Sequence, residues 1–224
     1  MDIYYLILVV PALIFSFIAQ AMVKSTFTKY SSKKLERQFT GSQAANYLLQ
    51  QNGVSGVTVK PIAGSLTDNF NPTDMTVNLS EPVYNVNSIA AVGVAAHETG
   101  HAIQHNKGYV PMKFRSMLVP VANIGSSAGP LLAILGLSLS FSFLIDIGLI
   151  LFFGSVLFYI VTLPVEFNAS KRALKTLKAA GVMSKDELKG VKKVLTAAAM
   201  TYVSSALVSI GNFLRFFLLT KRRD

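Results

Sequence analysis

Five consecutive residues near the middle of the chain have the types and spacing needed for metal chemistry: His97, Glu98, Thr99, Gly100 and His101. On a helix, residues four apart lie on one face, so both imidazoles can bind the same ion. The glutamate beside the first histidine can then accept a proton from an attacking water. This HExxH pattern predicts a zinc-dependent hydrolase with His97 and His101 as ligands and Glu98 as general base.

The residues around the motif favour a helix over 88–108. Ser88 is a suitable N-cap, and the small and apolar run 89–96 follows it. The alternative is that two stacked histidines serve only as polar, solvent-facing residues. The chain has only three histidines, and a chance HExxH in it has odds of roughly one in a thousand. We therefore favour the metal site.

A catalytic zinc needs a third protein ligand. His105 continues the same helix face, but at 1.5 Å per residue it lies about 12 Å along the axis from His97, which is far for one ion. Among the carboxylates, Asp146 falls on the expected outer side of the membrane. Asp186 and Glu187 begin a lysine-rich helix after Ser184, so they have an ordinary capping explanation.

Glu166 has no such explanation. It follows a long apolar run, and no charged residue lies within four positions on either side. A carboxylate in such surroundings is costly unless it is paired or bound. The alternative is that Glu166 is an interfacial carboxylate that pairs with Lys171 and Arg172. We predict that Glu166 is the third ligand, and that His105 lies in the second shell or on the substrate side.

The composition indicates the environment of this site. Of 224 residues, 51% are hydrophobic and 14% charged, and 21 Lys and Arg against 11 Asp and Glu give a net charge of +10. Soluble domains carry about 25% charged residues. The apolar excess argues against disorder and against a nucleic-acid partner, whereas a membrane protein explains both the excess and the basicity. The absence of cysteine excludes disulfides and thiolate metal sites.

Four charge-poor segments could lie in a bilayer, whose core takes about 20 apolar residues. Residues 3–23 predict an uncleaved anchor and not a signal peptide, because the basic residues follow this segment. Residues 117–137 and 143–163 predict a helical hairpin with a short outer turn. Residues 194–219 contain several polar residues and Arg215, which would face protein or water, so we expect a membrane-embedded helix there that either spans or re-enters.

Charge bias orients these segments. Lys24–Arg37, Lys107–Arg115 and Lys171–Lys193 together hold 16 of the 21 basic residues, which places the regions around the proposed ligands in the cytoplasm. The tail Lys221-Arg222-Arg223 would lie outside if the last helix crossed, against that bias. The stretch 24–37 suits either an amphipathic helix on anionic lipid or a solvated face.

The water-exposed part shows local signals for a small mixed fold. A helix is expected from Thr40 to Gln51, strands over 54–62 and 75–79, and a turn at 68–72 between them. We therefore predict a mainly α integral membrane protein with three to four transmembrane helices and a cytoplasmic catalytic region that contains a small β-sheet. Its parts are an anchor (1–23), a catalytic region (24–116), a hairpin (117–163), a cytoplasmic segment with the third ligand (164–193), and an embedded helix with a basic tail (194–224).

Three segments carry a family resemblance. Residues 88–105, 163–170 and 194–203 closely resemble the YugP-type neutral zinc metallopeptidases, over nearly the whole chain. That family is similar to the CAAX prenyl proteases and HtpX-type membrane peptidases, which carry HExxH and a later Glu-x-x-x-Asp on helices. The resemblance implies a zincin-like catalytic region, one Zn²⁺ per chain, the same ligands and base, and a bacterial plasma membrane with the active site facing the cytoplasm.

The resemblance extends to residues around the ligands. It implies an edge strand beside the cleft, where a peptide could add as a further strand: Met75, Thr76, Val77, Asn78, Leu79 and Ser80. The aspartate of the relatives, four residues after the ligand glutamate, is Ser170 here. Ser170, Asn168 beside it and Tyr202 are therefore candidates for supporting a ligand histidine or for the substrate side, and an amide would polarise an imidazole less strongly than a carboxylate. Apart from the resemblance, residue chemistry alone makes Tyr84, Tyr202 and His105 candidates for stabilising an oxyanion.

These observations predict a membrane-bound zinc metalloendopeptidase that cleaves membrane or membrane-proximal proteins. The alternative is a zinc-binding membrane scaffold or sensor without hydrolysis, which would have no need of Glu98. An intramembrane protease of the site-2 type is disfavoured, because the apolar run before His97 is far shorter than a span. The expected partners are a protein or peptide substrate and the lipid bilayer, with no nucleic acid; the sequence carries no signal for an oligomeric state.

Overall fold

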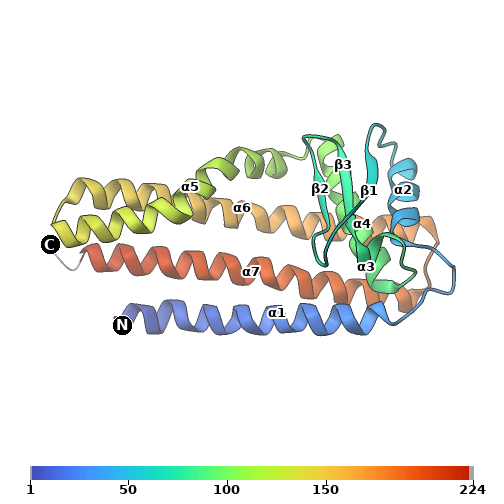
Figure 1. The fold of residues 1–224 in the computed structure, drawn as a ribbon, viewed down its shortest axis with the longest axis horizontal. Coiled ribbons are helices and arrows are strands. Elements are labelled where there is room, and N and C mark those ends of the chain that lie inside the picture. The colour runs from blue at the N-terminus through green and yellow to red at the C-terminus, as the bar shows by residue number, and fades with distance from the viewer. Residues whose placement is uncertain (1, 222–224) are drawn as a thin grey trace. The chain divides into compact units, whose positions relative to one another are not determined.

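The computed structural model describes residues 2–221. Its elements follow the chain in this order (Figure 1): the π-helical turn η1 (Tyr5–Val9), α1 (Val10–Ser31), α2 (Gly41–Gln51), β1 (Thr58–Ile62), β2 (Asn69–Asn71), β3 (Thr76–Ser80), α3 (Glu81–Tyr84), α4 (Ile89–Asn106), α5 (Val110–Leu139), α6 (Ser142–Ala180) and α7 (Lys185–Lys221). They form two compact units. Residues 2–20, 110–165 and 200–221 make the helical unit, and residues 21–109 and 166–199 make the mixed unit.

Four helices among residues 2–221 are long and apolar enough to cross a membrane: Tyr5–Ser31, Val110–Leu139, Ser142–Ala180 and Lys185–Lys221. This confirms the predicted mainly α-helical membrane protein. Each helix is longer than the charge-poor segment that predicted it, because the polar residues that follow or precede a span continue the same helix. Residues 222–224 of the predicted basic tail lie outside the described residues.

In the helical unit, α5 and α6 form the expected hairpin, joined at Ser140, whose φ of 54° reverses the chain. Small residues let the two helices approach closely. A Cβ atom at Gly148 would lie 2.6 Å from the backbone nitrogen of Ala133, so only glycine fits there. Helix α5 contains Pro120 and Pro130 and changes direction along its length (Figure 1), as expected when a proline removes a helical hydrogen bond.

The helical unit also accommodates its arginine. The Nε and Nη2 atoms of Arg215 donate to Oδ2 of Asp2 at 2.9 and 2.8 Å. The guanidinium also lies 5.0 Å from the ring centre of Tyr5 and 5.2 Å from that of Phe216. The charge in α7 is therefore satisfied by a carboxylate and two aromatic faces, which is how an arginine in a membrane-embedded helix is tolerated.

The mixed unit is built around a three-stranded sheet of order β1-β3-β2, in which β3 pairs parallel with β1 and antiparallel with β2. The side chains of Val77 and Leu79 on β3 are fully buried, in a core shared with α2, α3 and α4. Helix α2 begins at the expected place, with a capping box between Thr40 and Gln43.

Two expectations for the sheet are corrected. The segment 68–72 is not only a turn, because Asn69–Asn71 forms β2; the reversal follows it, where the Asn71 side chain accepts a hydrogen bond from the Thr73 backbone. The predicted edge strand Met75–Ser80 is wrong on two counts. Met75 precedes β3 with a φ of 54°, and β3 lies in the centre of the sheet with β1 and β2 on its two sides. The edge next to α4 belongs to β2 instead.

Candidate zinc site

Helix α4 carries the HExxH motif, as predicted, within two residues of the expected bounds. The Ser88 hydroxyl accepts a hydrogen bond from the Ala91 backbone at 3.1 Å and caps the helix. The residues before the motif are small or apolar and almost all buried. Packing on nearly all sides holds α4 rigidly, which suits a helix that presents metal ligands.

The third predicted ligand comes from α6. This helix does not end near Pro164, as the sequence suggested, but continues to Ala180. Proline removes one hydrogen bond and still permits a helix whose freed backbone is satisfied by its surroundings. Gly100 explains how α4 reaches this part of α6: a Cβ atom at position 100 would lie 2.7 Å from the Ala169 carbonyl oxygen. The glycine inside the motif therefore allows the close crossing of the two helices.

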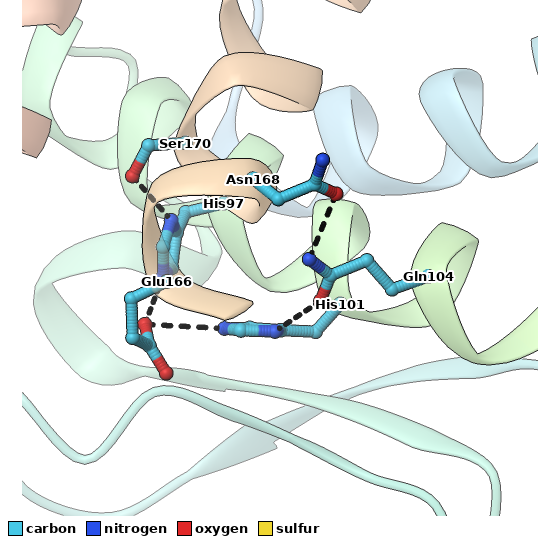
Figure 2. Close-up of polar contacts among 6 residues, drawn as sticks. All are labelled: His97, His101, Gln104, Glu166, Asn168 and Ser170. Atoms are coloured by element: carbon cyan, nitrogen blue, oxygen red, sulfur yellow. Dashed lines mark hydrogen bonds and ion pairs between the residues drawn. The ribbon is translucent and has the colours of Figure 1, made fainter. Parts of the chain in front are cut away.

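At this crossing the three predicted ligands meet (Figure 2). Oε2 of Glu166 lies 3.2 Å from Nε2 of His97 and 3.4 Å from Nε2 of His101. One donor atom from each residue lies within 4.8 Å of the other two, and these three residues form the candidate metal group among the described residues. The Glu166 side chain is only 2% exposed. A nearly buried carboxylate between two imidazoles is the arrangement that a bound cation would stabilise.

The two spacings from the Glu166 oxygen to the imidazoles fit zinc. Ligand nitrogen and oxygen atoms about 2.0–2.2 Å from an ion, at tetrahedral angles, are roughly 3.3 Å apart. The distances of 3.2 and 3.4 Å from the Glu166 oxygen to the two imidazole nitrogens match that edge length. Two histidines and one glutamate are also the donor set of one common kind of catalytic zinc site, which keeps a fourth position open.

His97 is oriented by Ser170. The Ser170 hydroxyl lies 3.2 Å from Nδ1 of His97, one turn along α6 from Glu166 (Figure 2). In the tautomer that leaves Nε2 free for a metal, Nδ1–H donates to this hydroxyl. Ser170 thus supplies a neutral acceptor at the position where the resemblance implied an aspartate. The sequence-based concern that this support would be missing is resolved by the serine itself.

His101 is oriented by a longer network. Its Nδ1 lies 3.0 Å from Oε1 of Gln104, and Nε2 of Gln104 donates to Oδ1 of Asn168 at 3.0 Å (Figure 2). Arg172 Nε donates to the same Asn168 oxygen at 2.7 Å. Gln104 is fully buried, so this chain fixes the imidazole through groups that cannot turn to water. Asn168 was expected to orient a histidine directly, but it acts through Gln104.

Gln104 was missed by sequence reasoning, although a signal was present. It lies three residues after His101 on the predicted helix, and residues at this spacing are neighbours on a helix surface. Arg172, four residues after Asn168, followed the same rule. Gln104 is neither a metal ligand nor charged, and Arg172 was considered only as a partner for the Glu166 carboxylate, not for Asn168.

Glu98 points to the sheet side of α4. Burial raises the pKa of its carboxyl to about 7, and the nearby charges of Glu166 and Asp68 raise this pKa further. The charge of His97 and a hydrogen bond from the Phe70 backbone N–H lower the pKa and partly offset the effect of burial. A carboxyl that gains and loses a proton near neutrality suits a group that both accepts and returns one. One edge of β2 pairs with β3, and the opposite edge is the outer edge of the sheet. Because the Phe70 N–H donates to Glu98 and not to β3, it points away from β3, at this outer edge.

The other predicted residues are less closely tied to the ligands. His105 is exposed and is not part of the metal group; its ring lies 5.7 Å from that of Phe70 on β2. Tyr84 is partly buried and packs against the core under the sheet. Tyr202 lies on α7 in the helical unit. Their roles in second-shell or oxyanion chemistry stay predictions.

Comparison with known proteins agrees with this geometry. Residues 5–221 match the family described as "Putative neutral zinc metallopeptidase". The chain is 46% identical over 215 residues to the protein described as "Putative membrane protease YugP" from Bacillus subtilis (strain 168), with 96% of each chain covered. No solved structure matches it. The HExxH helix, the buried glutamate and the four apolar helices therefore occur in a chain that is similar, along nearly its whole length, to the protein with this description.

Proposed function

Since the chain belongs to the family of neutral zinc metallopeptidases, we propose that it is a membrane-bound zinc endopeptidase whose ligands are His97, His101 and Glu166 and whose general base is Glu98. The convergence of three donor atoms from α4 and α6, at spacings that suit zinc, is the observation that carries this proposal. Its active site faces the cytoplasmic side of a bacterial plasma membrane, as the basic segments around the ligands favour.

The protein groups divide the reaction among them. When bound, zinc would supply Lewis-acid polarisation of a peptide carbonyl and a lowered pKa for the attacking water. Glu98 accepts the proton of that water and returns it to the leaving amine, a task that suits a carboxyl whose pKa burial raises to about 7. Ser170 and Gln104 hold the two imidazoles in the tautomer that directs Nε2 inward.

The corrected sheet suggests where a substrate lies. At the outer edge of β2, the Phe70 N–H donates a hydrogen bond to Glu98. An extended peptide that pairs with this edge would pass beside the general base, and main-chain pairing gives affinity without demanding one sequence. The substrates we propose are therefore extended segments of membrane or membrane-proximal proteins. The substrate strand proposed for residues 75–80 is transferred to Asn69–Asn71.

Substitution of Glu98 tests the function. Glu98→Gln keeps the size of the side chain and removes the base, so the purified variant should bind zinc as wild type does and cleave unfolded casein about 100- to 10,000-fold more slowly. Zinc content and cleavage are measured on the same sample. Wild-type cleavage by a zinc-loaded Glu98→Gln protein would overturn the proposal. A wild-type protein that binds zinc and cleaves no protein substrate would instead favour the scaffold or sensor.

A further inference from the structure

A second site lies in the mixed unit, where the end of α1 meets the beginning of α7. It is a pocket of about 530 Å³ with four lysines, two threonines and an apolar remainder: Met22, Thr26, Lys29, Tyr30, Lys189, Lys192, Lys193, Thr196 and Ala197. None of these residues takes part in the zinc site. The function of this pocket is therefore considered separately from the peptidase site.

In space, the lining changes from apolar to basic in the same direction on both helices, although the order along the sequence differs between them. Along α1, Met22 belongs to the apolar run of the first span, and Thr26 and Lys29 follow one and two turns later. Along α7 the order is reversed: Lys189 and Lys192 come first, and Ala197 follows toward the apolar part. The helices thus present a charged end and an apolar end together, at the place where each enters its candidate span.

The charged end has an excess of positive charge. Lys189 forms an ion pair with Asp186 at 2.8 Å. Lys29, Lys192 and Lys193 have no carboxylate within ion-pair distance in the described part of the chain, and all three are exposed. Lys33 adds a further cation, with Nζ 5.5 Å from the ring centre of Tyr30. Three or four uncompensated ammonium groups around one pocket select an anion.

The apolar part is formed by close packing. Tyr30 is buried, and its ring lies against α7 at Gly190, where a Cβ atom would lie 2.8 Å from the ring. The glycine lets the tyrosine close one side of the pocket. Met22, which lies earlier on α1, remains 37% exposed. A small inorganic anion would leave this apolar surface unused.

We propose that this pocket binds an anionic phospholipid of the bilayer. Its phosphate lies among Lys29, Lys192 and Lys193, the threonine hydroxyls donate to the headgroup oxygens, and an acyl chain follows Met22 and Ala197. Basic pockets at the membrane end of helices are the recognised setting for acidic headgroups. The paired change from basic to apolar favours an amphiphile over a free phosphate or an acidic peptide.

Native mass spectrometry of the full-length protein in detergent tests this proposal. Phosphatidylglycerol or phosphatidylcholine is titrated, and retained lipids are counted for wild type and for Lys29→Gln/Lys192→Gln/Lys193→Gln. The matched control, Lys24→Gln/Lys34→Gln/Lys178→Gln, removes the same charge from exposed positions outside the pocket. We expect one phosphatidylglycerol retained in preference to phosphatidylcholine, with affinity on the order of 100-fold weaker in the pocket variant and less than about threefold weaker in the control.

Two further arms separate the sources of the anion. Inorganic phosphate and glycerophosphoglycerol, which lacks acyl chains, should raise the thermal midpoint much less than phosphatidylglycerol does at the same concentration. Equal stabilisation by phosphate would overturn the lipid in favour of a simple anion site. Equal losses in the pocket and control variants would show general charge attraction, and would also overturn the proposal. Zinc content, unchanged in both variants, verifies that the protein is folded.

Discussion

At two places along α6 a glycine allows a close helix crossing, and the two crossings serve different purposes. In the helical unit, Gly148 lets α6 meet α5 at Ala133, and the contact is one of small apolar surfaces. In the mixed unit, Gly100 lets α4 meet α6 at Ala169, and here the close approach brings His97, His101 and Glu166 together. The first crossing needs only steric fit. The second must also hold polar groups in register, so it depends on side chains around it.

Among substitutions that leave the three ligands in place, the largest effect on zinc affinity is expected at the second crossing. In Gly100→Ala the new methyl group would lie 2.7 Å from a backbone oxygen, so α4 and α6 must separate. We expect destabilisation of about 1–3 kcal/mol and, because the ligands no longer converge, zinc affinity weaker on the order of 100-fold. Competition with a fluorescent chelator measures the affinity, and thermal unfolding measures the stability.

Gly148→Ala is the matched control, with a methyl group 2.6 Å from the Ala133 nitrogen. It should lower the thermal midpoint of the zinc-free protein by an amount similar to that of Gly100→Ala and leave the zinc affinity of the folded protein unchanged. If the two glycine variants lost zinc affinity equally, the distinction between a steric crossing and a ligand-bearing crossing would be lost.

The next effect concerns the support of His101. Gln104→Leu removes the acceptor for the imidazole Nδ1–H within a buried network. Zinc affinity should fall about 10- to 100-fold, as it does when second-shell partners of metal-bound histidines are removed. Gln104→Glu keeps an acceptor and should retain most of the affinity in the same chelator competition. A Leu variant that binds zinc as tightly as wild type would show that the network does not orient the ligand.

The smallest effect is expected at Ser170. Its single hydroxyl lies 3.2 Å from Nδ1 of His97, a contact less buried than the Gln104 network. Ser170→Ala should weaken zinc binding by less than about tenfold. Ser170→Asp, which places a charged acceptor beside Nδ1 of His97, should bind zinc at least as tightly as wild type. Isothermal titration with zinc measures both affinities, and an Ala variant that binds zinc more tightly than the Asp variant would contradict this prediction.

The sequence predicted what depends on short spacing. His97 and His101 share a helix face by periodicity, the hairpin of α5 and α6 follows from two apolar runs and a polar turn, and the helix start at Ser184 follows from its cap, where Ser184 and Glu187 exchange hydrogen bonds. The isolation of Glu166 from other charges also pointed to the ligand. Each of these signals lies within a few residues or within one helix.

What the sequence could not supply is the approach of distant segments. Only the family resemblance, and no local signal, pointed to position 170 as a neighbour of a histidine 73 positions earlier. Nothing in the sequence indicates that Gly100 is needed for the backbone of Ala169. The order of the sheet was missed for the same reason. Three residues, Asn69–Asn71, with turn-forming types at both ends, pair with β3 only because that strand and α4 provide a surface for them. Tertiary context decides such short strands.

The central claim is that Glu166 completes one zinc site with the two histidines. Metal analysis of purified wild-type protein and Glu166→Ala, both after dialysis against trace zinc, measures this most directly. We expect close to one zinc per wild-type chain and little in the variant, since the loss of one of three ligands weakens binding on the order of 1,000-fold. Full retention of zinc by a folded Glu166→Ala protein would contradict the site.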